Sequence, residues 1–196
     1  MKKNFLIATI ALFAIQCSKS DVKTEVSTDK IAVENLEKSE EISTDSLKIF
    51  AGETKKLLVK NITAQIAKGG VESSEEFCNI EAMPLTKSMS DKHGLFISRV
   101  SDKMRNPKNI ANAEELKLIK NYKKQLLAGE ILKPIRTETH YYEPLLTNAM
   151  CLQCHGEPGK NIQPKVVAEI AQLYPKDLAT GYKDNEVRGL ISIKTK

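Results

Sequence analysis

The feature that most constrains this chain is a run of five residues near its C-terminal end, Cys151-Leu152-Gln153-Cys154-His155. The spacing C-x-x-C-H is the attachment signature of c-type haem. Two thiols at this spacing can form thioethers to the vinyl groups at one porphyrin edge, and the adjacent imidazole can bind the iron as the proximal ligand. The chain must therefore fold so that these three side chains face one cavity, and we expect one covalent haem c per chain.

Three other roles of paired cysteines compete with this interpretation. A thioredoxin-like pair would lie near the start of its domain, in a βαβ unit, whereas Cys151 and Cys154 come late in the chain. A zinc site would need a second pair of ligands at similar spacing, and the sequence contains none. A disulfide between the two cysteines would leave the adjacent His155 without a role. Haem attachment is the interpretation that uses all three residues.

The start of the chain has the pattern of an export signal. Lys2 and Lys3 precede an apolar stretch from Phe5 to Ile15, and Cys17 follows directly. Such a segment is removed from the mature protein, so we expect a signal peptide over residues 1–16. A cysteine at the cleavage site predicts a bacterial lipoprotein with a diacylglycerol on the Cys17 thiol. The site departs from the usual lipobox because Gln16 stands where Gly or Ala is common, so an ordinary signal with an incidental cysteine is the alternative.

Composition then divides the rest of the chain in two. Residues 17–46 contain four Lys and eight Asp+Glu, a net charge of −4, and too few large apolar residues for a core. This segment is predicted to be a flexible linker behind the lipidated cysteine. Residues 47–196 contain 24 Lys+Arg and 17 Asp+Glu, a net charge of +7, and form the expected folded domain. We therefore expect a periplasm-facing protein of the bacterial cell envelope, anchored to the membrane by lipid.

The order of expected elements predicts an α+β fold with an antiparallel sheet. Apolar periodicity indicates helices over 47–66, 71–90, 110–126 and 166–173, and strands over 95–100, 131–138, 140–146 and 187–193. Gly69-Gly70 separates the first two helices. A four-helix bundle of the cytochrome c-prime type is the alternative, but its motif lies almost at the chain end. Here about forty residues follow His155, including a strand that such a bundle does not accommodate.

The second axial position of the iron has several candidate ligands. A helical cysteine on an apolar face is usually a small buried hydrophobic residue, so position alone does not select Cys78. Cys78 is nevertheless the thiol left over once Cys17, Cys151 and Cys154 have been assigned. From the residues alone, the candidates are Cys78, His93, His140, Met83, Met89, Met104 and Met150.

Six segments in one order resemble a known family: Cys78–Ala82, Arg99–Asn109, Tyr142–Pro144, Cys151–Gly156, Ala179–Tyr182 and Asp184–Gly189. The family comprises single-haem c-type proteins long described only as a domain of unknown function. Its members occur as exported haem proteins and as sensor parts of bacterial histidine kinases and chemoreceptors. The resemblance covers roughly residues 47–194. One departure is Val100, where the family more often has Thr.

The resemblance implies a PAS-like fold, in which helices that include a long N-terminal one flank an antiparallel sheet. It also implies His/Cys ligation of the iron, with Cys78 as the distal ligand opposite His155. Guanidinium groups suit paired contacts to carboxylates, so we expect Arg105, and after it Arg99, to bind the haem propionates. Tyr142, with Tyr141 and Pro144, is expected to line the pocket.

Two functions in different classes follow. The first is a lipid-anchored electron carrier, or a partner-dependent redox role, between envelope proteins; the second is a haem-based redox or gas sensor. The sequence contains no transmembrane helix or kinase after the domain, so a signal would have to leave through a partner protein, which favours electron transfer. No catalytic constellation surrounds the motif, and the basic charge forms no dense run of the kind that binds nucleic acid.

Overall fold

The computed structural model describes residues 41–196. The predicted signal peptide, Cys17 and nearly all of the predicted linker lie outside these residues. The elements are α1 (Thr44–His93), β1 (Phe96–Val100), a 3-10 turn (Pro107–Asn109), α2 (Ala113–Leu127), β2 (Ile135–Arg136), β3 (His140–Leu146), α3 (Ala149–His155), α4 (Pro164–Leu173) and β4 (Val187–Lys194). No helix in this part of the chain is long and apolar enough to cross a membrane.

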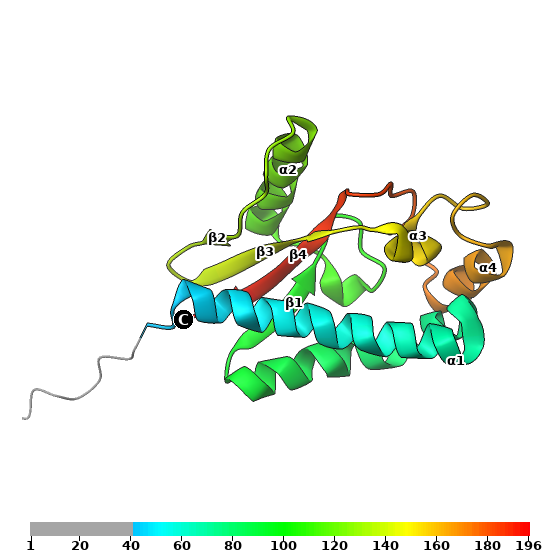
Figure 1. Cartoon of the computed structure of the whole chain (residues 1–196), viewed down its shortest axis with the longest axis horizontal. Coiled ribbons are helices and arrows are strands. Elements are labelled where there is room, and N and C mark those ends of the chain that lie inside the picture. Colours follow the sequence, from blue (N-terminus) through cyan, green and yellow to red (C-terminus); the bar gives the residue numbers. More distant parts are fainter. Residues whose placement is uncertain (1–40) are drawn as a thin grey trace, which may run out of the picture. The chain divides into compact units, whose positions relative to one another are not determined.

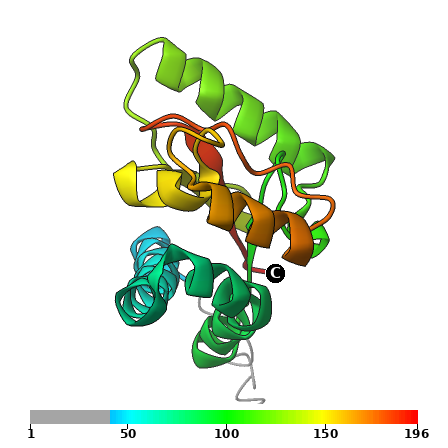
Figure 2. The same ribbon diagram turned by 90° about the vertical axis from the view of Figure 1, so that its right-hand side faces the viewer.

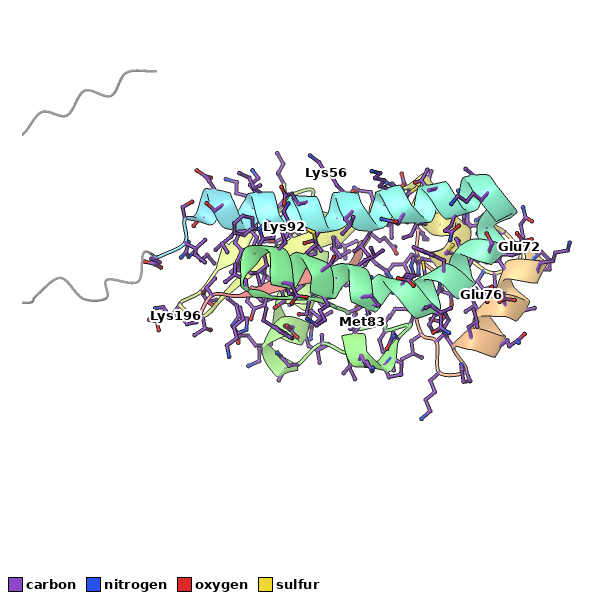
Figure 3. All side chains as sticks on the ribbon, turned by 90° about the horizontal axis from the view of Figure 1, so that it is seen from below. Lys56, Glu72, Glu76, Met83, Lys92 and Lys196 are labelled. Atoms are coloured by element: carbon purple, nitrogen blue, oxygen red, sulfur yellow. The ribbon has the colours of Figure 1, made fainter. Side chains whose placement is uncertain are left out.

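Helix α1 is a hairpin of two antiparallel halves. It breaks at Gly69 and Gly70, and Gly70 has φ 81°, a left-handed conformation that side chains other than glycine's disfavour. Figures 1 and 3 show the two halves side by side. At the end of the hairpin opposite this turn, Lys92 Nζ forms an ion pair with Glu53 Oε2 at 2.7 Å. The two helices predicted on either side of Gly69-Gly70 are thus confirmed, with a start at Thr44 because the Ser43 hydroxyl caps the first turn.

The strands form one antiparallel sheet in the order β1-β4-β3-β2. All four predicted strands are present, although β2 contains only Ile135 and Arg136 of the expected 131–138. Pro134 immediately precedes β2 and has no N–H to donate, which limits this edge strand at its start. Arg99 on β1 lies opposite Ile191 on β4, and Tyr142 on β3 lies opposite Ser192.

Helices cover both faces of the sheet, as Figure 2 shows. The α1 hairpin packs on one face through a core of Leu47, Ala51, Met89, Ile97, Tyr141, Ile191 and Ile193. On the other face, α2 packs on a core of Val100, Ala111, Ile119, Tyr122, Tyr142, Val187 and Leu190. Helix α4 forms a smaller cluster with Ile162, Tyr174 and Val71 near the turn of the hairpin. The predicted α+β architecture is therefore confirmed.

One irregularity in β4 bears on the site. Leu145 pairs with Gly189 and Leu146 pairs with Val187, so Arg188 is the extra residue of a β-bulge. Gly189 is required beside it, because an added Cβ would overlap the carbonyl oxygen of Val100. The bulge also explains why Val187 and Leu190, three residues apart, lie in the same core cluster.

Candidate functional site

A cavity of about 200 Å³ lies among both halves of α1, strands β1 and β4, the loop after β1, and α3. Apolar side chains of α1 form much of its wall, among them Val59, Ile62, Ile66 and Ala82. The reactive or charged side chains that line it are Glu75, Cys78, Arg99, Arg105, Cys151, Cys154, His155 and Arg188. The cavity therefore brings together all three residues of the C-x-x-C-H motif and Cys78, which is 73 residues earlier.

The motif lies on α3, a short helix that periodicity did not reveal. Asn148 caps it, since its Oδ1 accepts a hydrogen bond from the backbone N–H of Cys151 at 3.1 Å. The helical i, i+3 spacing then places Cys151 and Cys154 on one face. Asn148 three residues before Cys151 is an N-cap signal that could have indicated the helix from sequence.

A later segment holds the C-terminal end of α3 in place. The N–H of Tyr182 donates to the carbonyl of His155 at 2.9 Å, and the N–H of Gly181 donates to that of Gly156 at 2.7 Å. A side chain at Gly156 would collide with the carbonyl oxygen of Leu152 and with Asn161. The orientation of the motif is thus fixed by backbone contacts on both sides of His155.

The orientation of the His155 ring is fixed by a backbone carbonyl, and one ring nitrogen remains without a partner among the described residues. Its Nδ1 lies 2.8 Å from the carbonyl oxygen of Ala179. Because a carbonyl only accepts, Nδ1 must carry the proton, and Nε2 keeps a free lone pair. Burial lowers the pKa of His155 well below its ordinary value, and the cations Arg188 and Arg105 lower it further. The imidazole is therefore neutral, as metal binding requires.

The cavity cysteines are free thiols. No disulfide joins Cys78, Cys151 and Cys154 in the described part of the chain. Burial raises the pKa of Cys78 to about 11, and the Glu75 carboxylate contributes to this rise, whereas Arg99 and Arg105 oppose it. Without a metal, Cys78 is a protonated thiol, and a metal would have to displace its proton.

Arg105, which the sequence predicted to bind the haem propionates, lines the cavity, but all of its guanidinium nitrogens donate to groups of the protein. Its Nη1 donates to both carboxylate oxygens of Glu75 at 2.9 and 3.0 Å, and its Nε donates to Asp177 at 3.1 Å. Its Nη2 donates to the carbonyl of Cys154 at 2.6 Å. Burial opposes the charge, but the two carboxylates raise the pKa of Arg105 overall. Arg105 thus locks α3 to α1 and has no free pair of donors for a propionate.

Tyr142 does not lie in the cavity. Side chains alternate between the two faces of a strand, so Tyr141 and Tyr142 point in opposite directions. Tyr141 belongs to the core under α1, whereas Tyr142 is buried against α2, on the far side of the sheet from Arg99. Neither Tyr141, Tyr142 nor Pro144 is among the residues that line the cavity.

The structure narrows the candidates for the second axial ligand. His93 does not line the cavity: its ring stacks on the Phe50 ring with centroids 3.9 Å apart, and its side chain is only 9% exposed. His140 stacks on Tyr142 at 5.6 Å. Met89 lies in the core under α1, and Met104 does not line the cavity. Cys78, Met83 and Met150 remain at the cavity wall.

The Tll0287-like family model, described as Tll0287, matches residues 19–195. The chain belongs to the Tll0287-like family. The match spans all six segments on which the resemblance rests, so the family predicted from sequence is confirmed. A search of curated proteins finds no match.

A solved structure has the same fold as this Tll0287-like chain. It is the crystal structure of the cyanobacterial heme-protein Tll0287, with a TM-score of 0.57 and 21% sequence identity. The alignment covers 78% of this chain and 96% of that chain. The Tll0287-like fold therefore includes the PAS-like sheet and the long N-terminal helix that the sequence predicted.

Sequence reasoning missed three polar residues of the Tll0287-like site. Glu75 and Asp177 hold Arg105, and Arg188 reaches the cavity from the bulge in β4. Glu75 lies in a run of early carboxylates, Ser73-Ser74-Glu75-Glu76, that suits the start of a helix equally well. No feature of the sequence distinguishes the buried carboxylate from the exposed one, because only tertiary packing makes the difference.

Proposed function

We propose that this chain holds one covalent haem c in the cavity and acts in electron transfer in the bacterial envelope. The observation that carries the proposal is the His155–Ala179 hydrogen bond at 2.8 Å, in a cavity that also contains Cys78, Cys151 and Cys154. The donor set suits haem: two thiols on one helix face, a neutral imidazole and an apolar wall. The matched protein is described as a heme-protein, which supports the same cofactor here.

In this proposal the chain's own residues fix the haem on one side. Cys151 and Cys154 provide the thioether sulfurs, and His155 provides the proximal ligand through Nε2. The carbonyl of Ala179 holds the ring orientation and makes the imidazole more basic. When bound, haem iron supplies one-electron redox chemistry.

Cys78 is the proposed distal ligand. It comes from the second half of α1, whereas His155 comes from α3, so the two reach the cavity from different elements. Burial and Glu75 raise the pKa of the Cys78 thiol overall, and the cations Arg99 and Arg105 offset only part of this rise. A thiolate donates charge to iron, so we expect a low reduction potential.

The cellular setting is part of the same proposal. The basic and apolar segment before Cys17 supports export, a lipid on Cys17 and a location in the periplasm-facing envelope. A partner protein in the envelope would then donate or accept the electron. Two protein ligands on the iron leave no open position, which favours electron transfer over gas sensing.

The first test measures covalent haem. The chain is expressed in full with the c-type maturation machinery, and a pyridine haemochrome assay is expected to give about one haem per chain. Cys151→Ala with Cys154→Ala should abolish covalent haem, whereas Cys17→Ser should retain it and lose only the membrane association. A wild-type chain without covalent haem would refute the proposal.

The second test concerns Cys78. Cys78→Ala should remove a low-spin thiolate signature from the ferric electronic and paramagnetic resonance spectra. Met83→Leu is the matched control, because Met83 lines the same wall and the replacement conserves volume. Identical spectra of wild type and Cys78→Ala would exclude Cys78 as the ligand. Carbon monoxide binding to reduced wild type would favour sensing over electron transfer.

A further inference from the structure

Two arginines line the cavity without a carboxylate partner. Arg99 comes from β1 and Arg188 from β4. Among residues 41–196, no Asp or Glu lies within ion-pair distance of either guanidinium group, in contrast to Arg105 in the same cavity. The wall near these two side chains therefore carries positive charge without a direct carboxylate partner, and the Asp177 carboxylate acts on Arg188 only from beyond ion-pair distance.

Arg99 keeps part of its donor capacity free. Its Nε donates to the hydroxyl of Thr86 at 3.0 Å, and its Nη2 donates to the carbonyl of Ala82 at 3.1 Å. Both acceptors are neutral groups on the second half of α1. They orient the guanidinium plane, and the remaining donor, Nη1, has no partner in the described part of the chain.

Arg188 is aimed by the bulge in β4. Its Nη1 donates to the hydroxyl of Ser101 at 2.7 Å and to the carbonyl of Lys103 at 3.0 Å. Its Nε is buried and has no partner among residues 41–196. The Tyr182 ring supports the guanidinium group from one side, with its centroid 5.4 Å from Cζ. Bulges re-aim side chains next to functional sites, and Gly189 allows this one.

The arrangement is unfavourable in the chain alone. A part-buried cation without a counter-ion is destabilising unless its donors are satisfied, and both arginines are part-buried. Burial lowers the pKa of Arg99, and the nearby Arg188 charge lowers it further; burial also lowers the pKa of Arg188. A fold that keeps two such groups beside an apolar cavity leaves room for anions that would compensate them.

We infer that Arg99 and Arg188 form a dicarboxylate-binding pair, whose ligand is the two propionate groups of the haem. This inference rests on the proposed function. It replaces Arg105 with Arg188 in the role expected from sequence. Guanidinium groups bind carboxylates through directed, charge-assisted hydrogen bonds, and the donors without a partner among residues 41–196 are Arg99 Nη1, Arg188 Nη2 and the buried Arg188 Nε. Arg105 instead serves Glu75 and Asp177.

The test compares stability with and without haem. Arg99→Met and Arg188→Met keep an apolar stem and remove the charge. In chemical denaturation, each substitution should lower the denaturation midpoint of the haem-loaded chain. The haem-free chain, expressed without the maturation machinery, should show an unchanged or a higher midpoint. Arg105→Met is the control, and it should lower both midpoints because it leaves Glu75 and Asp177 unpaired.

Equal losses with and without haem would overturn the inference, since they would assign Arg99 and Arg188 a purely structural role. A second readout is the propionate bending band in the resonance Raman spectrum of the ferric chain. The frequency of this band should shift in Arg99→Met and Arg188→Met and should not shift in Lys103→Met. An unchanged frequency in Arg99→Met and Arg188→Met would overturn the inference even where the haem-free chain does not fold. Arg188→Lys should restore part of the effect, because Lys keeps the charge but not the planar fork.

Three outcomes separate the inference from other interpretations and from the proposed function. Succinate could stabilise the haem-free wild type but not the haem-free Arg188→Met variant. If Arg188→Met then left the midpoint of the haem-loaded chain unchanged, the pair would bind a free dicarboxylate and the inference would be overturned. A wild-type chain without covalent haem would refute the proposed function itself. A fully loaded wild type with equal losses in both states would refute the inference alone.

Discussion

Arg105 is the single residue that joins most parts of the site. Its guanidinium group contacts Glu75 on α1, Asp177 in the segment after α4 and the Cys154 carbonyl on α3. The side chains of Arg105 and Glu75 are 9% and 2% exposed, so water cannot replace the lost partner if one is removed. The pair therefore determines how the motif helix sits on the α1 hairpin.

We expect Glu75→Gln to destabilise the chain by about 3 kcal/mol, because it removes one charge of a buried ion pair and leaves the other in place. Chemical denaturation of the wild type and the variant measures the difference. The control is Glu76→Gln, since Glu76 is the exposed neighbour on the same helix and its change should stay within about 0.5 kcal/mol. Similar effects of the two substitutions would contradict the buried network.

Single residues were predictable from the sequence where chemistry imposes a spacing. Cys151, Cys154 and His155 follow from the C-x-x-C-H pattern, and the cavity brings them together. Glu75 and Asp177 were not predictable, because a carboxylate looks the same in sequence whether it is solvated or buried against Arg105. Arg105 lines the cavity, but the propionate role expected of it conflicts with its hydrogen bonds to Glu75, Asp177 and Cys154.

At the scale of elements, α3 depends on its N-cap more than a longer helix would. It has only seven residues, so its intrinsic stability is low and each end contact is a large part of the total. Asn148 provides the side-chain cap at the first turn, with Oδ1 3.1 Å from the Cys151 nitrogen.

We expect Asn148→Ala to cost about 1 kcal/mol of stability, because it leaves the Cys151 N–H without its acceptor. The same change should lower the fraction of chains that acquire covalent haem, since the two thiols lose a fixed spacing. Denaturation and the haemochrome assay measure the two effects. Asn161→Ala is a useful comparison, because Asn161 caps the turn after α3 through Glu157 and does not touch a motif cysteine. Equal loss of haem in both variants would argue against the cap.

Elements with a strong apolar period were predictable, and those without one were not. The α1 hairpin, α4 and all four strands correspond to patterns in the sequence, and Gly69-Gly70 marked the turn. Helix α2 starts at Ala113 instead of residue 110, because Ile110 bridges to Ser101 and Asn112 forms a capping box with Glu115. The bulge at Arg188 depends on the pairing of β3 with β4, which a single strand's sequence does not encode.

At the scale of the whole molecule, the core on the α2 face contains buried tyrosines. Burial raises the pKa of Tyr122 to about 12, with a further contribution from Glu143. Burial likewise raises the pKa of Tyr142 to about 12, with contributions from Glu114 and Glu115. An unfolded tyrosine titrates near pH 10. These hydroxyls therefore stay protonated in the folded chain at pH values where the unfolded chain has lost the protons.

We expect the free energy of unfolding to fall as the pH rises from about 10 towards 12. In this window the unfolded state binds fewer protons than the folded state, so the slope is negative. Each such tyrosine contributes at most about 1.4 kcal/mol per pH unit. Denaturant titrations at several alkaline pH values measure the slope, and Tyr122→Phe should make it shallower. An equal slope in the wild type and the variant would show that Tyr122 does not contribute.

The architecture of the fold was predictable from the sequence, but the face of the sheet to which each strand residue points was not. Tyr142 begins a segment, Tyr142–Pro144, that resembles the family pattern, yet its position in the alternation of β3 points its side chain towards α2. Which face of the sheet meets α1 and which meets α2 depends on how the elements pack. That information is absent from any one strand.

Both ends of the described chain are anchored next to the turn between β2 and β3. Arg136 donates to the carbonyl of Ile42 at 2.7 Å, and the N–H of Thr195 donates to the carbonyl of Thr139 at 2.8 Å. Figure 1 shows α3 and α4 at the opposite end of the sheet from the C-terminus. An affinity tag, an electrode linker or a fused domain can thus be added after Lys196 without covering α3. In a chain shortened to residues 41–196, a short peptide from Lys196 to Glu41 would allow a circular permutant opened at Gly69-Gly70.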